Sequence, residues 1–495
     1  MKGRKLSRRD FLFLTGGAAA GSVLAACQPQ VVEKTVEVPV EVTKIVTEVE
    51  EVEVPVEVEV PVAGEVVNIE VWAQANEVEH YRSTAPMLAG PLVNEMLEAE
   101  GDPRRVTVEG MRDDAGWGDY KKKFTLAADA GEAPHIVCSG HEDVPVWANA
   151  GYIVPFDECR DMYPEYDDVI DSLWFAGEWG GKGWAVPQDT EARPMFFNKA
   201  KLKEMGWSEE EVEALPEKIK NGEFTLDDLI ATAKEAIDKG VVEPGYGFWH
   251  RPSKGGDHLQ FYFAFGGRLY DPEQDKLVVV EDALVKWYAF QRRVVEEGIT
   301  PEGFIGTDWS IWHDTVSHGN VMFWNGGVWH WADWAANYVK DMGGQEYLFE
   351  NVGYALEPAG EPGQKAGTLS HPLVYMIVSE EATGDQGYYD LACAVLAKTS
   401  TAEMNTLHAV GSTHLGMNKK QADYEPYKED RFLSDTLYML DYNYYAPNHV
   451  MYGAYFDIIW DGMVKAENGE LTPEEAAQQA LDLLQVELAD FMIFE

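Results

Sequence analysis

Residues 66–72 read Val-Val-Asn-Ile-Glu-Val-Trp, and a regular alternation of strand and helix patterns begins with them. Two further short segments with strand patterns follow at 105–109 and 135–139. The segments between the runs, 86–100 and 120–130, carry apolar residues at helical spacing. This order of strand, helix, strand, helix and strand predicts a parallel sheet covered by helices, and therefore an α/β fold.

The alternation continues along the rest of the chain. We expect a strand at 195–198, a helix from a capping box at Thr225–Asp228 to about Lys239, a hairpin from 266, and helices from Glu142, Glu281 and Asp308. The roughly 430 residues after residue 65 exceed the usual size of one hydrophobic core, so two domains are expected.

The first 27 residues contain two export signals in a row. Ser7–Leu12 (SRRDFL) is a twin-arginine signal, and Leu24–Cys27 (LAAC) resembles a bacterial lipobox. The alternative is a transmembrane anchor, but the apolar stretch at 11–26 contains three glycines and is short for a span of about 20 residues. We therefore expect an export signal at 1–26 and lipid on Cys27. That lipid would anchor the protein extracytoplasmically, to the outer face of the cytoplasmic membrane.

The segment 27–65 is predicted to be a stalk. Valine and glutamate alternate from 31 to 61, interrupted by prolines. Such alternation usually indicates a half-buried strand. Here like charges recur on one face and proline removes ladder donors, so an extended, self-repelling tether is favoured. A self-associating β or coiled arrangement remains the alternative.

Charge and cysteine content restrict the function. The net charge of −47 argues against nucleic-acid binding and against attraction to anionic lipid. Apart from Cys27, the cysteines are Cys138, Cys159 and Cys393, which allow one disulfide or none. The chain has no metal-ligand spacing and none of the common catalytic motifs. We therefore expect no metal, no cofactor and no catalytic residues.

Short segments spread over 66–495 carry a resemblance to a known family. In chain order they are APHIV at 133–137, AGYIVPF at 150–156, GWAVPQDT at 183–190, FNK at 197–199, FTLDDL at 224–229, FGG at 265–267, VMFWNGGVW at 321–329 and ENGELTPEEA at 467–476. Together they resemble the bacterial extracellular solute-binding proteins of the maltose-binding, multiple-sugar ABC transporter type. The chain departs from the family pattern at His135 and Leu226, where the family has Asp and Trp, and carries extra residues at 207–222 and 338–353.

The resemblance implies a two-lobed, periplasmic-binding-protein-like fold of type II. Each lobe would be a mostly parallel sheet with flanking helices, joined to the other by hinge crossings. Lobe 1 would comprise 66–188 and 358–412, and lobe 2 would comprise 189–357 and 413–495. A monomer would close on a sugar or similar small polar solute and deliver it to the permease of an ABC importer. The rival functions are a secreted carbohydrate-active enzyme (a lyase or hydrolase) and a surface sensory or adhesion protein.

Sugars stack on aromatic rings and bind carboxylates and amides through their hydroxyls. Trp72 ends the first strand, Glu77 lies in the loop after it, and Glu142 follows the third strand. All three are expected at the carboxyl edge of the first sheet, where open α/β sheets bind ligands. The alternatives are a core role for Trp72 and helix capping for Glu142.

Further candidates lie where the resemblance places lobe crossings and the second lobe. Asp189 and Glu191 occupy a crossing, where they could instead form an ion pair at the hinge. In the segment Asn325–Trp329 the glycines allow a ligand to approach the backbone. Asn325 is expected to bind hydroxyls there, and Trp329 has the family position of a stacking ring.

Two second-lobe candidates have weaker support. Trp249 stands in a polar loop with Arg251, and Asp257 follows shortly after. Tyr455 lies near a family position for a stacking aromatic, but its neighbours have helical spacing and favour a core role.

Overall fold

The computed structural model describes residues 64–495. The predicted export signal, Cys27 and nearly all of the predicted stalk lie outside the described residues. Among the described residues, no helix combines the length and apolar character that a membrane crossing requires.

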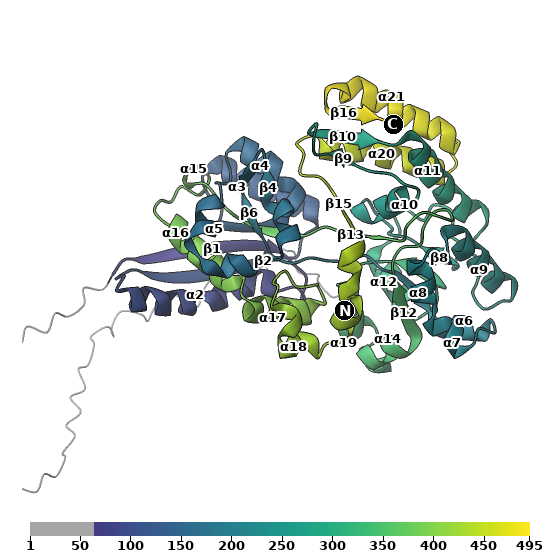
Figure 1. Ribbon diagram of the computed structural model, residues 1–495, viewed down its shortest axis with the longest axis horizontal. Helices are drawn as coiled ribbons and strands as arrows, with labels where there is room; N and C mark the ends of the chain where they lie inside the picture. The colour runs from purple at the N-terminus through teal and green to yellow at the C-terminus, as the bar shows by residue number, and fades with distance from the viewer. Residues whose placement is uncertain (1–63) are drawn as a thin grey trace, which may run out of the picture. The chain divides into compact units, whose positions relative to one another are not determined.

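A five-stranded sheet in the order β2-β1-β3-β14-β6 forms the centre of the first half of the fold. Its strands are β1 (Val66–Gln74), β2 (Arg105–Asp113), β3 (Ile136–Gly140), β6 (Ala185–Pro187) and β14 (Leu373–Ile377). Strand β1 runs parallel to β2 and β3, whereas β14 runs antiparallel to β3 and β6. Figure 1 shows β1 and β2 side by side with α2 along them. The predicted parallel sheet is confirmed for the first three strands.

Helices from two separate parts of the chain, 81–162 and 380–412, surround this sheet. They are α2 (Tyr81–Glu100), α3 (Trp117–Ala130), α4 (Val144–Ala150), α5 (Asp157–Met162), α15 (Glu380–Thr383), α16 (Tyr389–Thr399) and α17 (Ala402–Ser412). Helix α2 begins five residues before the expected start at Pro86. Pro86 has no N–H for the carbonyl of Arg82, and the hydroxyl of Tyr375 on β14 donates to that carbonyl instead (2.7 Å). A tertiary contact thus allows proline inside the helix.

The cysteine pairing that the sequence left open is decided by the helices around this sheet. Cys159 on α5 forms a disulfide with Cys393 on α16. Cys138 on β3 is buried and is the free cysteine of the described residues. The disulfide thus links α5 to α16, which lies more than two hundred residues later in the sequence.

A second sheet, in the order β12-β7-β11-β8, forms the centre of the other half. Its strands are β7 (Met195–Asn198), β8 (Phe248–Trp249), β11 (Phe323–Asn325) and β12 (Val352–Ala355). Strand β11 is parallel to β8 and antiparallel to β7. As in the first sheet, one strand opposes the others.

A small third sheet and several long helices complete this half. The sheet contains β9 (Tyr270–Asp271), β10 (Lys276–Val279) and β16 (Met492–Phe494), and the long helices are α9 (Leu226–Asp238), α11 (Glu281–Glu296), α12 (Trp309–Ser317), α20 (Tyr452–Glu467) and α21 (Pro473–Glu487). The shorter helices are α6 (Lys199–Glu204), α7 (Glu209–Glu213), α8 (Leu215–Lys220), α10 (Leu259–Ala264), α13 (His330–Asp333), α14 (Gln345–Asn351), α18 (Glu425–Lys428) and α19 (Arg431–Thr436). The predicted capping box of α9 is confirmed, because Thr225 N donates to the Asp228 carboxylate (2.8 Å).

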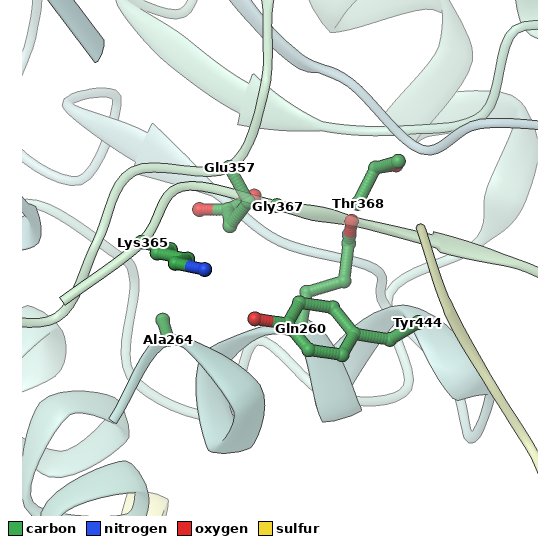
Figure 2. Close-up of a pocket in the computed structure, with 7 residues that line it drawn as sticks. All are labelled: Gln260, Ala264, Glu357, Lys365, Gly367, Thr368 and Tyr444. Atoms are coloured by element: carbon green, nitrogen blue, oxygen red, sulfur yellow. The ribbon is translucent and has the colours of Figure 1, made fainter. Parts of the chain in front are cut away.

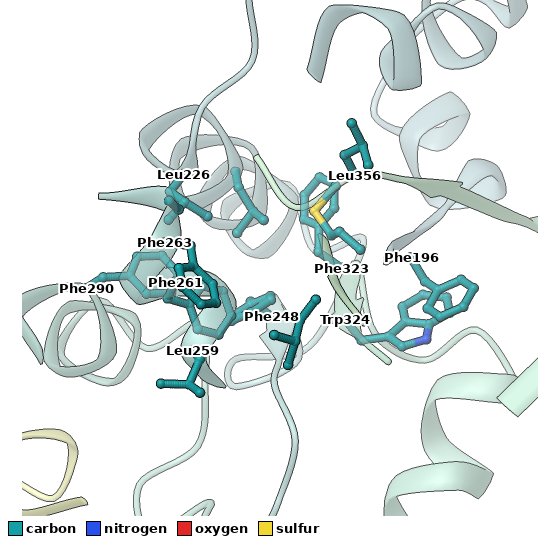
Figure 3. Close-up of a cluster of buried hydrophobic side chains, with 14 of the residues drawn as sticks. Phe196, Leu226, Phe248, Leu259, Phe261, Phe263, Phe290, Phe323, Trp324 and Leu356 are labelled. Atoms are coloured by element: carbon teal, nitrogen blue, oxygen red, sulfur yellow. The ribbon is translucent and has the colours of Figure 1, made fainter. Parts of the chain in front are cut away.

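The core of the second half is strongly aromatic. Figure 3 shows Phe248 and Phe323 of the sheet among Phe261 and Phe290 of helices α10 and α11. The ring of Phe248 is 6.0 Å from those of both Phe261 and Phe290, within the range of favourable aromatic pairs. These rings bury large apolar surfaces and fix the sheet against its helices.

Two chain segments connect the sheets and position the site. Residues 188–194 lead from β6 of the first sheet to β7 of the second. Residues 356–372 lead back from β12 to β14 and include β13 (Thr368–Ser370), which pairs with β15 (Asn443–Tyr445). We call these segments the first and second crossings.

Candidate functional site

Five buried polar residues surround the start of the first crossing, and we name them the crossing cluster. They are Glu79, Arg82, Asp189, His408 and His414. Asp189 Oδ2 lies 3.5 Å from Arg82 Nη2 and 3.1 Å from His408 Nε2. Its Oδ1 accepts a hydrogen bond from the backbone of Leu373 (3.0 Å). Arg82 also pairs with Glu79 at 3.1 Å.

The charged groups of the crossing cluster pair with one another. Burial alone raises the pKa of the Asp189 carboxyl, but His414, His408 and Arg82 together hold it well below its ordinary value. Burial lowers the pKa of both histidines, which keeps their imidazoles neutral. Asp189 is therefore ionised and fully paired, which is the condition under which a buried charge is tolerated.

A second group of residues begins on the same crossing with Glu191 and Arg193 and includes two indole rings. We name it the tryptophan cluster, and its members are Glu191, Arg193, Arg251, Asp257, Trp309 and Trp329. The Arg193 guanidinium lies 5.0 Å from the Trp329 ring centre, and that of Arg251 lies 4.9 Å from the Trp309 ring centre. Asp257 joins the two arginines, at 3.3 Å from Arg193 Nε and 3.0 Å from Arg251 Nη1.

The second crossing holds Arg193 in place. The backbone N–H of Arg193 donates to Thr368 Oγ1 (2.7 Å), and its Nη1 donates to the carbonyl of Leu369 (3.2 Å). Glu191 forms an ion pair with Arg193, in which Glu191 Oε1 faces Arg193 Nη1. Burial raises the pKa of Glu191 to about 7, although Arg193 acts in the opposite direction. This carboxyl group therefore changes charge near neutral pH.

The tryptophan cluster reaches solvent on one side. Trp309 and Trp329 are only half-buried, and the side chain of Arg251 is 22% exposed. Two partly accessible rings beside fixed guanidinium and carboxylate groups match what a polyhydroxylated ligand requires.

A third group, which we name the histidine cluster, contains His141, Glu142 and His371. His141 and Glu142 follow β3, and His371 precedes the adjacent strand β14. Glu142 lies 2.7 Å from His371 through Oε2 and 2.5 Å from Lys121 through Oε1. Burial, with His371 adding to it, lowers the pKa of His141 to about 3.

Residues of the histidine and tryptophan clusters shift the pKa of the same neighbouring groups. Tyr452 on α20 is buried, which raises the pKa of its hydroxyl, while Glu142 acts in the same direction and Arg193 opposes both. His371 likewise acts on Glu191. Charged residues from the first sheet's edge and from the first crossing thus converge.

A small pocket lies away from the three clusters, beside β13. Figure 2 shows Glu357, Lys365 and Tyr444 directing polar groups toward it. It has no room for a water molecule, so it does not provide a ligand site. Glu357 there accepts a hydrogen bond from Asn325 (2.6 Å), and burial raises its pKa to about 8.

The profile of a protein family described as "Bacterial extracellular solute-binding protein" matches residues 105–391, more than half of the chain. The chain belongs to this family. It is accordingly a binding protein that acts outside the cytoplasm, and not an enzyme. No curated protein matches the chain significantly.

Solved structures show the same fold. The GacH receptor of Streptomyces glaucescens, determined unliganded and with acarbose, is 19% identical with a TM-score of 0.66, and the match covers 86% of this chain and 99% of that chain. Maltose-bound MalE3 of T. maritima is 17% identical with a TM-score of 0.65, covering 86% and 100%. A solute-binding protein of Thermotoga lettingae, bound with alpha-D-tagatose, is 18% identical with a TM-score of 0.63, covering 85% and 99%. The two-lobed α/β fold is thereby confirmed.

Within this solute-binding protein, the structure brings together some of the residues that the sequence singled out. Glu191 and Trp329 both belong to the tryptophan cluster, joined by Arg193. Glu142 lies in the neighbouring histidine cluster. Asp189 occupies the same crossing but is fully paired inside the crossing cluster.

Other predicted site residues lie in the interior or on the surface. Trp249 and Tyr455 are buried in the core of the second half. Trp249 donates its indole N–H to the carbonyl of Gly245. Tyr455 donates its hydroxyl to the carbonyl of Val278. The structure gives these two a packing role, because a ligand cannot reach a ring enclosed on all sides. This is the alternative that the helical spacing around Tyr455 had favoured.

The remaining three are also separated from the tryptophan cluster. Trp72 packs in the first half with its indole N–H on Glu70 (2.6 Å) and Lys123 over its ring. Asn325 is buried against Glu357, and Glu77 is exposed.

Three members of the clusters are not marked by any pattern in the sequence. Trp309, Lys121 and His371 carry no motif, and the last two reach Glu142 only through the sheet and the helix beside it. The sequence marks Arg251 and Asp257 only as parts of a polar loop, and the structure brings these two side chains together (3.0 Å).

Proposed function

We propose that this solute-binding protein captures a sugar or a similar polyhydroxylated solute at the tryptophan cluster. One observation carries the proposal: two half-buried indole rings, each beside a guanidinium group, flank a shared carboxylate. Ring faces suit the C–H surfaces of a sugar, and the planar charged groups suit its hydroxyls. Related folds bound to acarbose, maltose and tagatose support this ligand class.

The site lies on the segments that link the two sheets, which suits capture by closure. We propose that lobe 1 comprises 66–188 and 358–412 and that lobe 2 comprises 189–357 and 413–495. The ligand would lie between them, and the closed monomer would deliver it to the permease of an ABC importer. The family membership supports this role.

A screen of sugars by thermal shift tests the ligand class. A true ligand present at a hundredfold excess over Kd is expected to stabilise the protein by about 2.7 kcal/mol. The products after incubation are analysed in parallel. Conversion of a stabilising sugar into smaller products would support the carbohydrate-active enzyme instead, and the absence of any stabilising sugar would contradict the proposed ligand class.

We propose further that twin-arginine export and a lipid on Cys27 anchor the protein to the outer face of the cytoplasmic membrane. The motifs at 7–12 and 24–27 support this proposal. Mass spectrometry of the membrane-extracted protein is expected to find a lipidated Cys27 at the mature N-terminus. Cys27→Ser should release the protein from membranes with unchanged ligand affinity. Membrane retention of that variant would contradict the lipid anchor.

A further inference from the structure

The histidine cluster offers a set of metal-ligating atoms that the proposed function does not use. His141, Glu142 and His371 each supply one such atom, and the three atoms lie within 4.8 Å of one another. Two imidazoles and one carboxylate are ligands that Zn²⁺ favours, with a fourth position left for water or another ligand. We propose that these three side chains bind a divalent transition metal ion, with Zn²⁺ as the best fit.

The backbone fixes this arrangement. Strands β3 and β14 pair antiparallel with Gly140 opposite Leu373, and the N–H of His141 donates to the carbonyl of Pro372 (3.3 Å). His141 and His371, each adjacent to one member of the strand pair, are therefore held side by side. Their ring centres are 4.8 Å apart. The set depends on sheet register and not on flexible loops.

The side chain of Asn448 orients His141 for metal binding. Asn448 Nδ2 donates to the carbonyls of Phe175, Ala176 and Glu178 at 2.9–3.1 Å. These three acceptors identify the amide nitrogen, so the amide oxygen faces His141 Nδ1 at 2.7 Å. Nδ1 must then carry the proton, and the lone pair is on Nε2. An imidazole held by an acceptor on one nitrogen is the usual arrangement of a metal-bound histidine.

The lone pair on His141 Nε2 accepts no hydrogen bond in the described part of the chain. His141 is fully buried, and its Nε2 has no hydrogen-bond partner among the described residues. Buried polar atoms are rarely left without a partner, so such an atom requires an explanation. A metal ion also bound by Glu142 and His371 would satisfy this lone pair.

The crossing cluster shows why a similar set of residues need not bind metal. Asp189, His408 and His414 also bring their ligand atoms within 4.8 Å of one another. There, however, Arg82 Nη2 lies 3.0 Å from His414 Nε2 and 3.5 Å from the Asp189 carboxylate, so a guanidinium already supplies the cation. In the histidine cluster the nearby cation is Lys121, which contacts Glu142 Oε1. Glu142 Oε2 instead faces the imidazole of His371.

Titration of the purified, EDTA-treated full-length chain with ZnCl₂ by calorimetry, without sugar, tests the proposal. We expect one high-affinity site, weakened at least tenfold in both His141→Gln and His371→Gln. His318→Gln, a change at the partly exposed histidine that follows α12, is the matched control and should leave the affinity unchanged. Co²⁺ should give the visible absorption of a site with nitrogen ligands, and the two variants should lose it.

The proposal is overturned if no such site is found, or if His141→Gln and His371→Gln bind Zn²⁺ as the unmodified chain does. It is also overturned if Mg²⁺ competes equally, because imidazoles do not favour that ion and binding would then reflect the acidic surface. If His141→Gln fails to fold, the partly exposed His371 decides the outcome. Failure of this test leaves the sugar proposal untouched, since no sugar is present.

Discussion

Asp189 of the crossing cluster and Glu191 of the tryptophan cluster lie two residues apart on the first crossing, and the two clusters use the same kinds of charged groups. In the crossing cluster the side chains of Arg82 and Asp189 are 4% and 1% exposed, and each charge has a partner. In the tryptophan cluster Arg251 and both indole rings are partly accessible, although Glu191, Arg193 and Asp257 are buried.

Accessibility to solvent, and not residue type, therefore distinguishes the candidate binding site from the structural ion network. A fully paired, dry network stabilises the crossing only as long as every member is present. A partly open network can exchange water for the hydroxyls of a ligand.

The largest effect is expected from Asp189→Asn. Loss of this charge removes one of the two carboxylate partners of the buried Arg82 and leaves it Glu79 alone, which should lower the free energy of unfolding by about 3 kcal/mol. Urea denaturation measures it. Asp282→Asn, which breaks an exposed i,i+4 pair with Lys286, is the control and should cost less than about 1 kcal/mol. Equal costs for both variants would remove the distinction between the clusters.

The next largest effect is the contribution of Glu191 to the pH dependence of stability. Its pKa is raised to about 7 in the folded state, so between about pH 4.5 and 7 the folded chain holds a proton that the unfolded chain has lost. Stability should therefore fall as pH rises through this range, by about 3 kcal/mol in all. Glu191→Gln should remove that part of the slope, seen as a difference between the two pH profiles of unfolding.

Glu357→Gln provides the matched control for the pH experiment. Burial raises the pKa of Glu357 to about 8, so its difference profile should have the same sign and extend to a higher pH. Because Glu357 lies outside the tryptophan cluster, only Glu191→Gln should also change the pH dependence of sugar affinity. An unchanged pH profile of stability in Glu191→Gln would refute the prediction for Glu191.

A smaller effect, on binding, is expected from Trp329→Ala. Loss of a ring that anchors a sugar should weaken affinity by about 2 kcal/mol, measured by calorimetry with a sugar found in the screen. Trp331→Ala is the matched control, because Trp331 is fully buried two residues away and its loss should cost about 3–5 kcal/mol of stability. If Trp329→Ala leaves sugar affinity intact, or destabilises the protein as much as Trp331→Ala, the tryptophan cluster is not the binding site.

The smallest effect is expected from Glu77→Ala. Glu77 is exposed in the loop after β1 and outside all three clusters. Its removal should change the free energy of unfolding by no more than about 0.5 kcal/mol. Sugar affinity, measured in the same way as for Trp329→Ala, should stay the same. A clear loss of affinity would instead restore the original expectation that the first sheet's edge contacts the ligand at this loop.

Much of the fold could be read from local patterns. The runs at 66–72, 105–109 and 195–198 became strands, and the caps at Thr225 and Asp308 begin helices where expected. These features depend on residues close in sequence, so periodicity and capping chemistry suffice to find them. The start of α2 was missed because a hydroxyl from β14 compensates for Pro86, and no local pattern reports such a contact.

The candidate site was predictable only in part. Glu191 and Trp329 were found because a family resemblance marked their segments. Burial, which decides whether an aromatic residue packs or binds, depends on the whole fold, so Tyr455 and Trp329 could not be distinguished by composition.

The sequence by itself determined the α/β class, the family and the acidic character of the chain, because alternation, motif order and net charge are properties of the linear chain. Only the tertiary structure decided that Cys159 pairs with Cys393 and that His141 and His371 face each other across two strands. The folded structure also places Asp189 between Arg82 and His408, whereas Glu191, two residues later, pairs with Arg193 beside the half-buried Trp329. These outcomes depend on segments distant in sequence, whose contact is set by sheet register and by the burial of apolar surface on both sides.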